Sequence, residues 1–180
     1  MGRRDELHAS QTDRTSMRDP GNSFLQKMKI GLISDTHGYL DPRIEKIFAG
    51  VDHILHAGDI GPDLIIHELS ALAPVTAVLG NNDSSPSFRL TEIVDLSRKK
   101  LLVHHIVAPR ELREELKLQI ARVRPDAVIF GHSHQPFNEV IGGVHFLNPG
   151  YAGRPRFNQP RSVALLNLDA KGLRPHFVEL

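Results

Sequence analysis

The sequence of 180 residues contains no cysteine, has a formal net charge of only +1, and lacks any apolar run long enough to span a membrane. The absence of cysteine excludes disulfides, thiolate metal ligands and cysteine nucleophiles, and it fits a reducing compartment such as the cytoplasm. A chain so close to neutral has no overall positive field of the kind that attracts nucleic acid or anionic lipid, although a local patch is compatible with it. These absences favour a globular cytoplasmic protein that is not bound to a membrane.

Apolar residues make up 40% of the chain and charged residues 24%, which is ordinary for a globular domain. The first 27 residues are mostly polar, and they predict a disordered N-terminal tail. A chain of about 150 residues already buries roughly two-thirds of its unfolded surface. We therefore expect residues 28–180 to form a single domain.

From Met28 onward, apolar runs of strand length alternate with helical patterns, which indicates an α/β layered sheet. A helix is expected to begin at Asp41 and Pro42, because Asp is a good N-cap and Pro suits the first helical position. Polar Ser97 and Arg98 separate two extended runs and predict an antiparallel hairpin. Two sheets packed face to face with helices outside accommodate these signals. The predicted strands cover residues 28–34, 52–58, 75–80, 88–96, 99–105, 126–131, 137–141, 144–148, 162–168 and 173–180, and the other predicted helices cover residues 62–72 and the stripe of Leu112, Leu116, Ile120 and Val123.

Potential ligands follow five successive predicted strands. In open α/β sheets the ligand site lies beyond the carboxyl ends of the strands. Each donor taken alone is more often a turn residue or a hydrogen-bonded core histidine, but independent turns would not place histidine at three of five strand ends. The residues are Asp35 and His37 in "SDTHG", Asp59 in "AGDIG", Asn81, Asn82 and Asp83 in "GNND", His104 with His105, and His132 with His134 in "GHSH".

Seven of these residues form a donor set too large for one tetrahedral zinc: Asp35, His37, Asp59, Asn81, His104, His132 and His134. The set suits two divalent metal ions about 3.5 to 4 Å apart that share one carboxylate. The positive charge of two such ions exceeds the negative charge of two aspartates and a hydroxide, so the site would attract a phosphodiester anion. Coordination can also lower the pKa of water to about 7, which would provide a hydroxide nucleophile. His132 and His134 are two residues apart and would then each bind a different metal.

The motifs "DTHG", "GD", "GNND", "H" and "GHSH", in this order, resemble the calcineurin-like metallophosphoesterase superfamily, and in particular its small bacterial and archaeal phosphodiesterase branch. The resemblance covers the chain from about Lys29 and implies a four-layer α/β/β/α sandwich. It implies that the first metal is bound by Asp35, His37, Asp59 and His134, and the second by Asp59, Asn81, His104 and His132. Asp59 would be the bridging ligand.

The chain departs from the pattern of many superfamily members at two positions. Asn82 stands where they have a histidine that is thought to protonate the leaving group, and Pro62 stands where they have a supporting aspartate. A general acid contributes about 10² to 10⁴ in rate, so we expect weaker catalysis that favours acidic leaving groups. Asn82 remains the expected catalytic and substrate-binding donor, positioning a phosphate oxygen.

Other residues near the motifs leave alternatives open. His105 replaces a glycine usual in the branch and is either a neighbour packed under the loop or a replacement acid; the run "LLV" before His104 favours His104 as the ligand. Tyr151 would narrow the pocket or stack on a base. In "LNPG" and "RPR", which resemble the final active-site loop, Gly150 and Arg154 are expected to contact substrate, with Arg154 and Arg156 otherwise solvated.

The expected function is hydrolysis of phosphodiesters, and of some monoesters, by in-line attack of the metal-bridging hydroxide. Manganese is the expected metal, with iron, nickel, cobalt and zinc as alternatives, because such mixed donors discriminate poorly. The expected substrate is a small phosphate ester, and the chain is compatible with a homo-oligomer. The alternative is a catalytically weak scaffold or binding module, since a relative in the eukaryotic retromer coat resembles this fold. A nuclease is less attractive, because proteins that track nucleic acid need clustered cations.

Overall fold

The computed structural model describes residues 27–156 and 158–180, so the predicted tail, except for Lys27, lies outside the described residues. The first of two five-stranded sheets is mixed. Its central strand β1 pairs in parallel with β2 and antiparallel with β9. The strand order is β10 (Gly172–Glu179), β9 (Ser162–Asp169), β1 (Met28–Ile33), β2 (His53–His56) and β3 (Val75–Ala77).

The second sheet is also mixed and contains the predicted hairpin. Strands β4 and β5 pair antiparallel, and both turn residues, Ser97 and Arg98, have positive φ angles of 48° and 61°, as in the tight turns that match strand twist. Strand β6 pairs in parallel with β5 and β8. The strand order is β4 (Thr91–Leu96), β5 (Lys99–His104), β6 (Ala127–Ile129), β8 (Val144–Asn148) and β7 (Phe137–Ile141).

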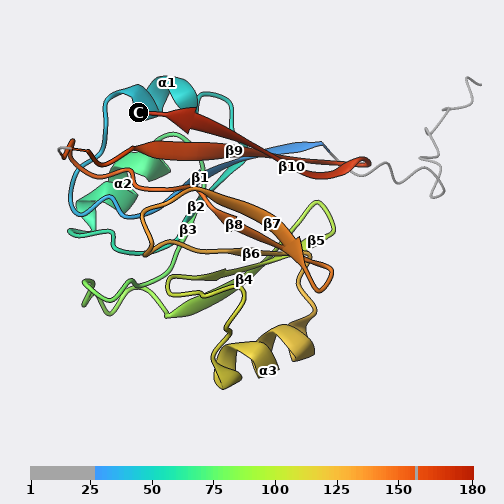
Figure 1. Cartoon of the computed structure of the whole chain (residues 1–180). Helices are drawn as coiled ribbons and strands as arrows, with labels where there is room; N and C mark the ends of the chain where they lie inside the picture. Colours follow the sequence, from blue (N-terminus) through green and yellow to red (C-terminus); the bar gives the residue numbers. More distant parts are fainter. Residues whose placement is uncertain (1–26, 157) are drawn as a thin grey trace, which may run out of the picture.

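Helices α1 (Arg43–Ile47) and α2 (Leu64–Ser70) cover the outer face of the first sheet, and α3 (Glu114–Val123) covers the second (Figure 1). The predicted α/β/β/α sandwich is therefore confirmed. Asp41 accepts the backbone N–H of Arg43 at 3.0 Å just before α1, but Pro42, expected at the first helical position, is the N-cap residue, so the helix begins one residue later than predicted. Helix α3 begins after the predicted Leu112, because Arg113 has an extended backbone with ψ of 147°. No helix in the described ranges has the length and apolar character needed to cross a bilayer.

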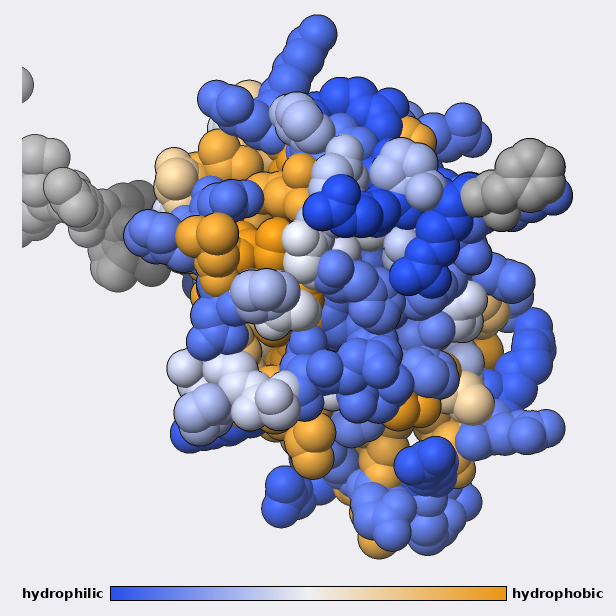
Figure 2. Space-filling model, turned by 90° about the vertical axis from the view of Figure 1, so that its left-hand side faces the viewer, coloured by the Kyte–Doolittle hydropathy of each residue, from blue (hydrophilic) through white to orange (hydrophobic). Residues whose placement is uncertain are grey.

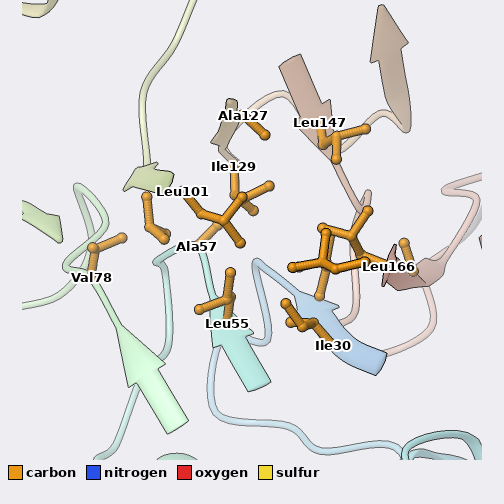
Figure 3. Close-up of a cluster of buried hydrophobic side chains, with 13 residues drawn as sticks. Ile30, Leu55, Ala57, Val78, Leu101, Ala127, Ile129, Leu147 and Leu166 are labelled. Carbon is orange, nitrogen blue, oxygen red and sulfur yellow. The ribbon is translucent and has the colours of Figure 1, made fainter. Parts of the chain in front are cut away.

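Buried aliphatic side chains fill the space between the sheets (Figure 3). Ile30 and Leu55 from the first sheet face Leu101 and Ile129 from the second. Side chains alternate along each strand, so Leu101 and Val103 of β5 point into this core while Leu102 between them packs on the α3 side. This alternation fixes the direction of the residues that follow β5.

Candidate metal centre and substrate cleft

Except for His104, which ends strand β5, the predicted donor residues lie in loops that follow parallel strands, at one edge of the two sheets. Asp35 and Asp59 follow the adjacent strands β1 and β2, and backbone hydrogen bonds such as His37 N–H to the Asp59 carbonyl, 2.9 Å, join their loops. The loop after β6 joins them through the His132 N–H, which donates to Asp35 Oδ2 at 3.1 Å. The sandwich thus brings segments almost a hundred residues apart to one place. Figure 2 views this edge, whose centre is mainly hydrophilic.

The backbone at this edge is strained. A non-glycine residue with positive φ is uncommon and costs about 1–3 kcal/mol. Such strain persists where the surrounding structure enforces it, and it concentrates at functional sites. Five predicted metal ligands have positive φ angles: Asp35 (57°), His37 (46°), Asp59 (53°), His132 (66°) and His134 (58°).

Two glycines allow other loops to approach the carboxylates closely. A Cβ atom at Gly80 would lie 2.1 Å from Asp59 Oδ1, and one at Gly131 would lie 2.8 Å from Asp35 Oδ2 and 2.0 Å from Ser34 Oγ. Side chains at either position would therefore displace the aspartates. This explains the glycines in "GNND" and "GHSH" by packing.

One group of donors consists of Asp35, His37 and His134. His134 Nε2 lies 3.3 Å from Asp35 Oδ1 and 3.5 Å from His37 Nε2. One atom from each of the three side chains lies within 4.8 Å of the others, which suits a shared metal ion. The fully buried Tyr151 ring packs beside His134, with ring centroids 4.7 Å apart, so Tyr151 supports this histidine and its hydroxyl group donates to the Arg154 carbonyl.

The second group consists of Asp35, Asp59 and His105, all buried. His105 Nε2 lies 3.5 Å from Asp59 Oδ2 and 4.0 Å from Asp35 Oδ1. Asp59 Oδ2 is also 3.7 Å from His37 Nε2, so this oxygen lies between the two donor groups. The His105 Nδ1 atom is held by the Ala57 carbonyl at 2.7 Å, which directs Nε2 toward the aspartates.

His104 lies outside the cluster, contrary to the expectation that it would be a metal ligand. Its Nδ1 atom lies 2.8 Å from Thr91 Oγ1 of the paired strand β4, and burial lowers its pKa. The reason is strand alternation: His105 continues the face of Leu101 and Val103 between the sheets, whereas His104 continues the face of Leu102. The apolar residues before His104 indicated a strand, but they did not show which of its side chains point between the two sheets. The two-residue periodicity would have identified His105.

A cavity of about 440 Å³ opens over the cluster. Its lining residues are His37, Asp59, Asn81, Asn82, His132, His134 and Arg156. The His132 ring lies beside the His105 ring, with centroids 5.3 Å apart, and Asn81 has an exposed side chain in the cavity. The structure therefore brings six of the seven predicted ligands together, with His105 in the place of the seventh.

Asn82 contacts Asp59. Its backbone N–H donates to Asp59 Oδ1 at 2.9 Å, and its side-chain amide donates to Oδ2 at 2.7 Å. Burial alone would raise the pKa of Asp59, but these two hydrogen bonds, with His105 and His37 nearby, hold the pKa below its ordinary value. Asp59 is thus kept as a carboxylate.

Asp83, also in "GNND", has a structural role. Its carboxylate accepts the backbone N–H groups of Ile60, Gly61 and Gly80 at 3.0, 2.9 and 2.8 Å. It thereby joins the loop after β2 to the loop after β3. The sequence contained this residue in its motif, but no spacing rule identified its role.

Two residues predicted to contact substrate lie elsewhere. Neither Gly150 nor Arg154 is among the described residues that line the cleft. Gly150 is buried with φ of 96°, and a Cβ atom there would lie 2.1 Å from Ser162 Oγ, so it serves the turn. The Arg154 guanidinium lies 5.2 Å from the centroid of the Tyr39 ring. Arg156 is the cation in the cleft, and it also lies over Tyr151.

A model of the calcineurin-like phosphoesterase superfamily domain matches residues 28–171. The chain is 38% identical to a probable metallophosphoesterase of Methanothermobacter thermautotrophicus over 156 residues, which is 81% of this chain and 89% of the relative. It is 28% identical to the phosphodiesterase YfcE of Escherichia coli, with 79% and 89% of the two chains covered. The chain belongs to the calcineurin-like phosphoesterase superfamily, and the predicted class, a metal-dependent phosphohydrolase, is confirmed.

Solved structures agree with this fold. A novel archaeal phosphodiesterase matches with a TM-score of 0.68 and 26% identity, covering 85% of this chain and all of the other. A Vps29 variant from Entamoeba histolytica matches with a TM-score of 0.67 and 23% identity, covering 85% of this chain and 99% of the other. At that identity, the second match shows the shared fold only.

The residues present fit the divalent metal ions that this family implies. Asp35 Oδ1 and His105 Nε2 are both buried, and neither has a hydrogen-bond partner in the part of the chain that the structure describes. Buried polar atoms in native proteins are almost always satisfied, and divalent cations held by these two atoms would satisfy both. The carboxylate and imidazole donors are ligands of first-row divalent metals.

Proposed function

We propose that this chain is a phosphodiesterase that holds two divalent metal ions. The observation that carries the proposal is that the two donor groups adjoin: they share Asp35, and the Asp59 Oδ2 atom lies 3.7 Å from His37 Nε2 and 3.5 Å from His105 Nε2. Asp59 is therefore proposed as the bridging ligand. Two-metal sites of this kind serve in-line displacement at phosphorus.

The proposed first site consists of Asp35, His37, Asp59 and His134, and the second of Asp59, Asn81, His105 and His132. When bound, the ions supply Lewis acidity and lower the pKa of water to about 7. Their charge exceeds that of the two aspartates, so the cleft would attract a phosphodiester anion. Manganese is our first choice, and iron, nickel, cobalt and zinc are the alternatives to be compared.

The chain's own residues orient the substrate in this proposal. Asn82 holds Asp59 as a carboxylate, and its amide borders the cleft, where it can also donate to a phosphate oxygen. Arg156 lines the same cleft and can form charge-assisted hydrogen bonds to phosphate. The favoured substrates are small diesters, with monoesters turned over in second place.

The test is metal-dependent hydrolysis of bis-p-nitrophenyl phosphate. We expect turnover with manganese and at least a 100-fold loss in Asp59→Asn, since even outer partners of metal ligands typically change metal affinity or activity 10- to 100-fold. Asp95→Asn, an exposed aspartate on β4, is the matched control and should keep wild-type turnover. Absence of turnover with every metal named above would refute the proposal and favour the scaffold alternative.

Leaving groups give a second test of the mechanism. Without a histidine after Asn81, the leaving oxygen has no general acid in the sequence motif, so its own acidity should control the rate. We expect bis-p-nitrophenyl phosphate to react at least about 10²-fold faster than an alkyl diester, measured by nitrophenolate absorbance and by phosphorus NMR. Equal rates would show that another group donates the proton.

A further inference from the structure

A second cavity, of about 230 Å³, adjoins the metal-binding cleft on the side of the second sheet. It shares Asn81 with the cleft, and Gly80 and His105 also line it. Its other lining residues are Leu79, Leu90, His104, Ile106 and Arg113. A phosphate ester bound at the metals would therefore have this cavity next to it.

A third cavity, of about 380 Å³, extends the second toward α3. The two share Leu90, His104, Ile106 and Arg113, and the third adds Leu116 and Gln119 of α3. Together they form a groove that runs from Asn81 to α3, which we call the β5–α3 groove. Hydrophobic surface lies on the α3 side of the hydrophilic centre in Figure 2.

The groove combines apolar walls with one oriented imidazole. Leu79, Leu90 and Ile106 supply aliphatic surface, and Leu90 is 66% exposed. The Thr91 hydroxyl group fixes the His104 ring. The charged residues Glu111, Arg113 and Glu115 have exposed side chains. Apolar walls with a few oriented polar groups are typical of small-molecule sites.

We propose that the β5–α3 groove binds one ester group of the substrate, and that this group is a flat aryl or heteroaryl ring. The inference rests on the proposed function and adds a substrate class to it. A ring can lie against Leu90 and Ile106 while its edge or face contacts the His104 imidazole. The adjacent histidines of "LLVHH" then serve two different purposes, with His105 at the metals and His104 at the substrate.

The experiment compares phenylphosphonate with methylphosphonate on the manganese-loaded full chain. Both carry the same anionic group for the metals, and only the first has a ring for the groove. Dissociation constants come from calorimetry, and inhibition of bis-p-nitrophenyl phosphate hydrolysis supplies a second readout. Partial burial of a ring should make phenylphosphonate bind about 10-fold more tightly. In Leu90→Ala this ratio should fall to about 3 or less, and in the control Leu64→Ala, an exposed leucine on α2, it should stay at about 10.

The outcomes separate the two proposals. Binding of both phosphonates with a ratio near 1 would overturn the inference and leave the phosphodiesterase proposal intact. An unchanged ratio in Leu90→Ala would also overturn it, and since Leu90 is already exposed, this substitution should not prevent folding. If neither phosphonate binds and no diester is hydrolysed, the proposed function fails and the inference fails with it.

Discussion

The sharpest prediction contrasts two neighbouring histidines. His105 Nε2 faces Asp59 Oδ2 at 3.5 Å, whereas the His104 ring is bound by Thr91 on the other side of β5. We therefore expect His105→Ala to lose most metal-induced stabilisation and His104→Ala to retain it. The variants differ by one position and remove the same side chain, so each is the control for the other.

The magnitude follows from binding linkage. A metal ion at 100 times its dissociation constant stabilises the folded state by about 2.7 kcal/mol. In a domain of this size, each kcal/mol raises the Tm by about 3 °C, so manganese should raise the wild-type Tm by about 8 °C. Loss of a ligand should weaken binding about 100-fold or more. The gain in His105→Ala then falls to about 0.4 kcal/mol, or about 1 °C.

The assay is thermal unfolding followed by circular dichroism, with and without manganese, at one metal concentration for all variants. The quantity compared is the rise in Tm on adding metal, because His105→Ala also alters the metal-free protein. A full rise in His105→Ala would refute the assignment. So would a selective loss in His104→Ala.

Three further predictions concern the supports of the site. Asp83→Ala should cost about 2 kcal/mol of unfolding free energy, measured by urea denaturation, because three backbone N–H groups lose their acceptor; Asp95→Ala, an exposed control on β4, should cost little. Burial lowers the pKa of His56 from 6.5 to about 4, so the neutral form stabilises the fold above pH 6.5, and about 2 kcal/mol of unfolding free energy should be lost by pH 5. His56→Asn should remove that part of the pH dependence of the unfolding free energy. The same pH dependence in wild type and His56→Asn would contradict the assignment. Arg161→Met should cost about 3 kcal/mol, since Arg161 and Asp41 form a buried ion pair at 2.8 Å, and a change in Tm below 2 °C would argue against it.

Much of the fold was accessible from the sequence because its patterns are local. Alternating apolar runs predicted the strands, and Ser97 with Arg98 marked the hairpin turn that the structure contains. The start of α3 was less predictable, since Leu112 continues the apolar stripe and packs against the core although it lies before the helix. Helical periodicity reports which side chains are buried, but it does not report where hydrogen bonding begins.

The sequence predicted most of the donor residues of the site, but few of the contacts between them. Strand ends gave Asp35, Asp59 and His134, because parallel strands deliver their carboxyl ends to one edge. To assign His105 to the site, one must know which residues of β5 point into the core between the sheets. The bonds of Asn82 to Asp59, and the place of Arg156 in the cleft, depend on loop conformation, which a single sequence does not encode in any simple period.

The left-handed backbone at the proposed metal ligands places stability and activity in opposition. Glycine adopts positive φ without a steric penalty, so His37→Gly would relax the backbone at a position where it would also remove a proposed metal ligand. Engineering that selects only for heat resistance would therefore tend to erase the cleft. A screen for robust variants of this protein has to select for turnover at the same time.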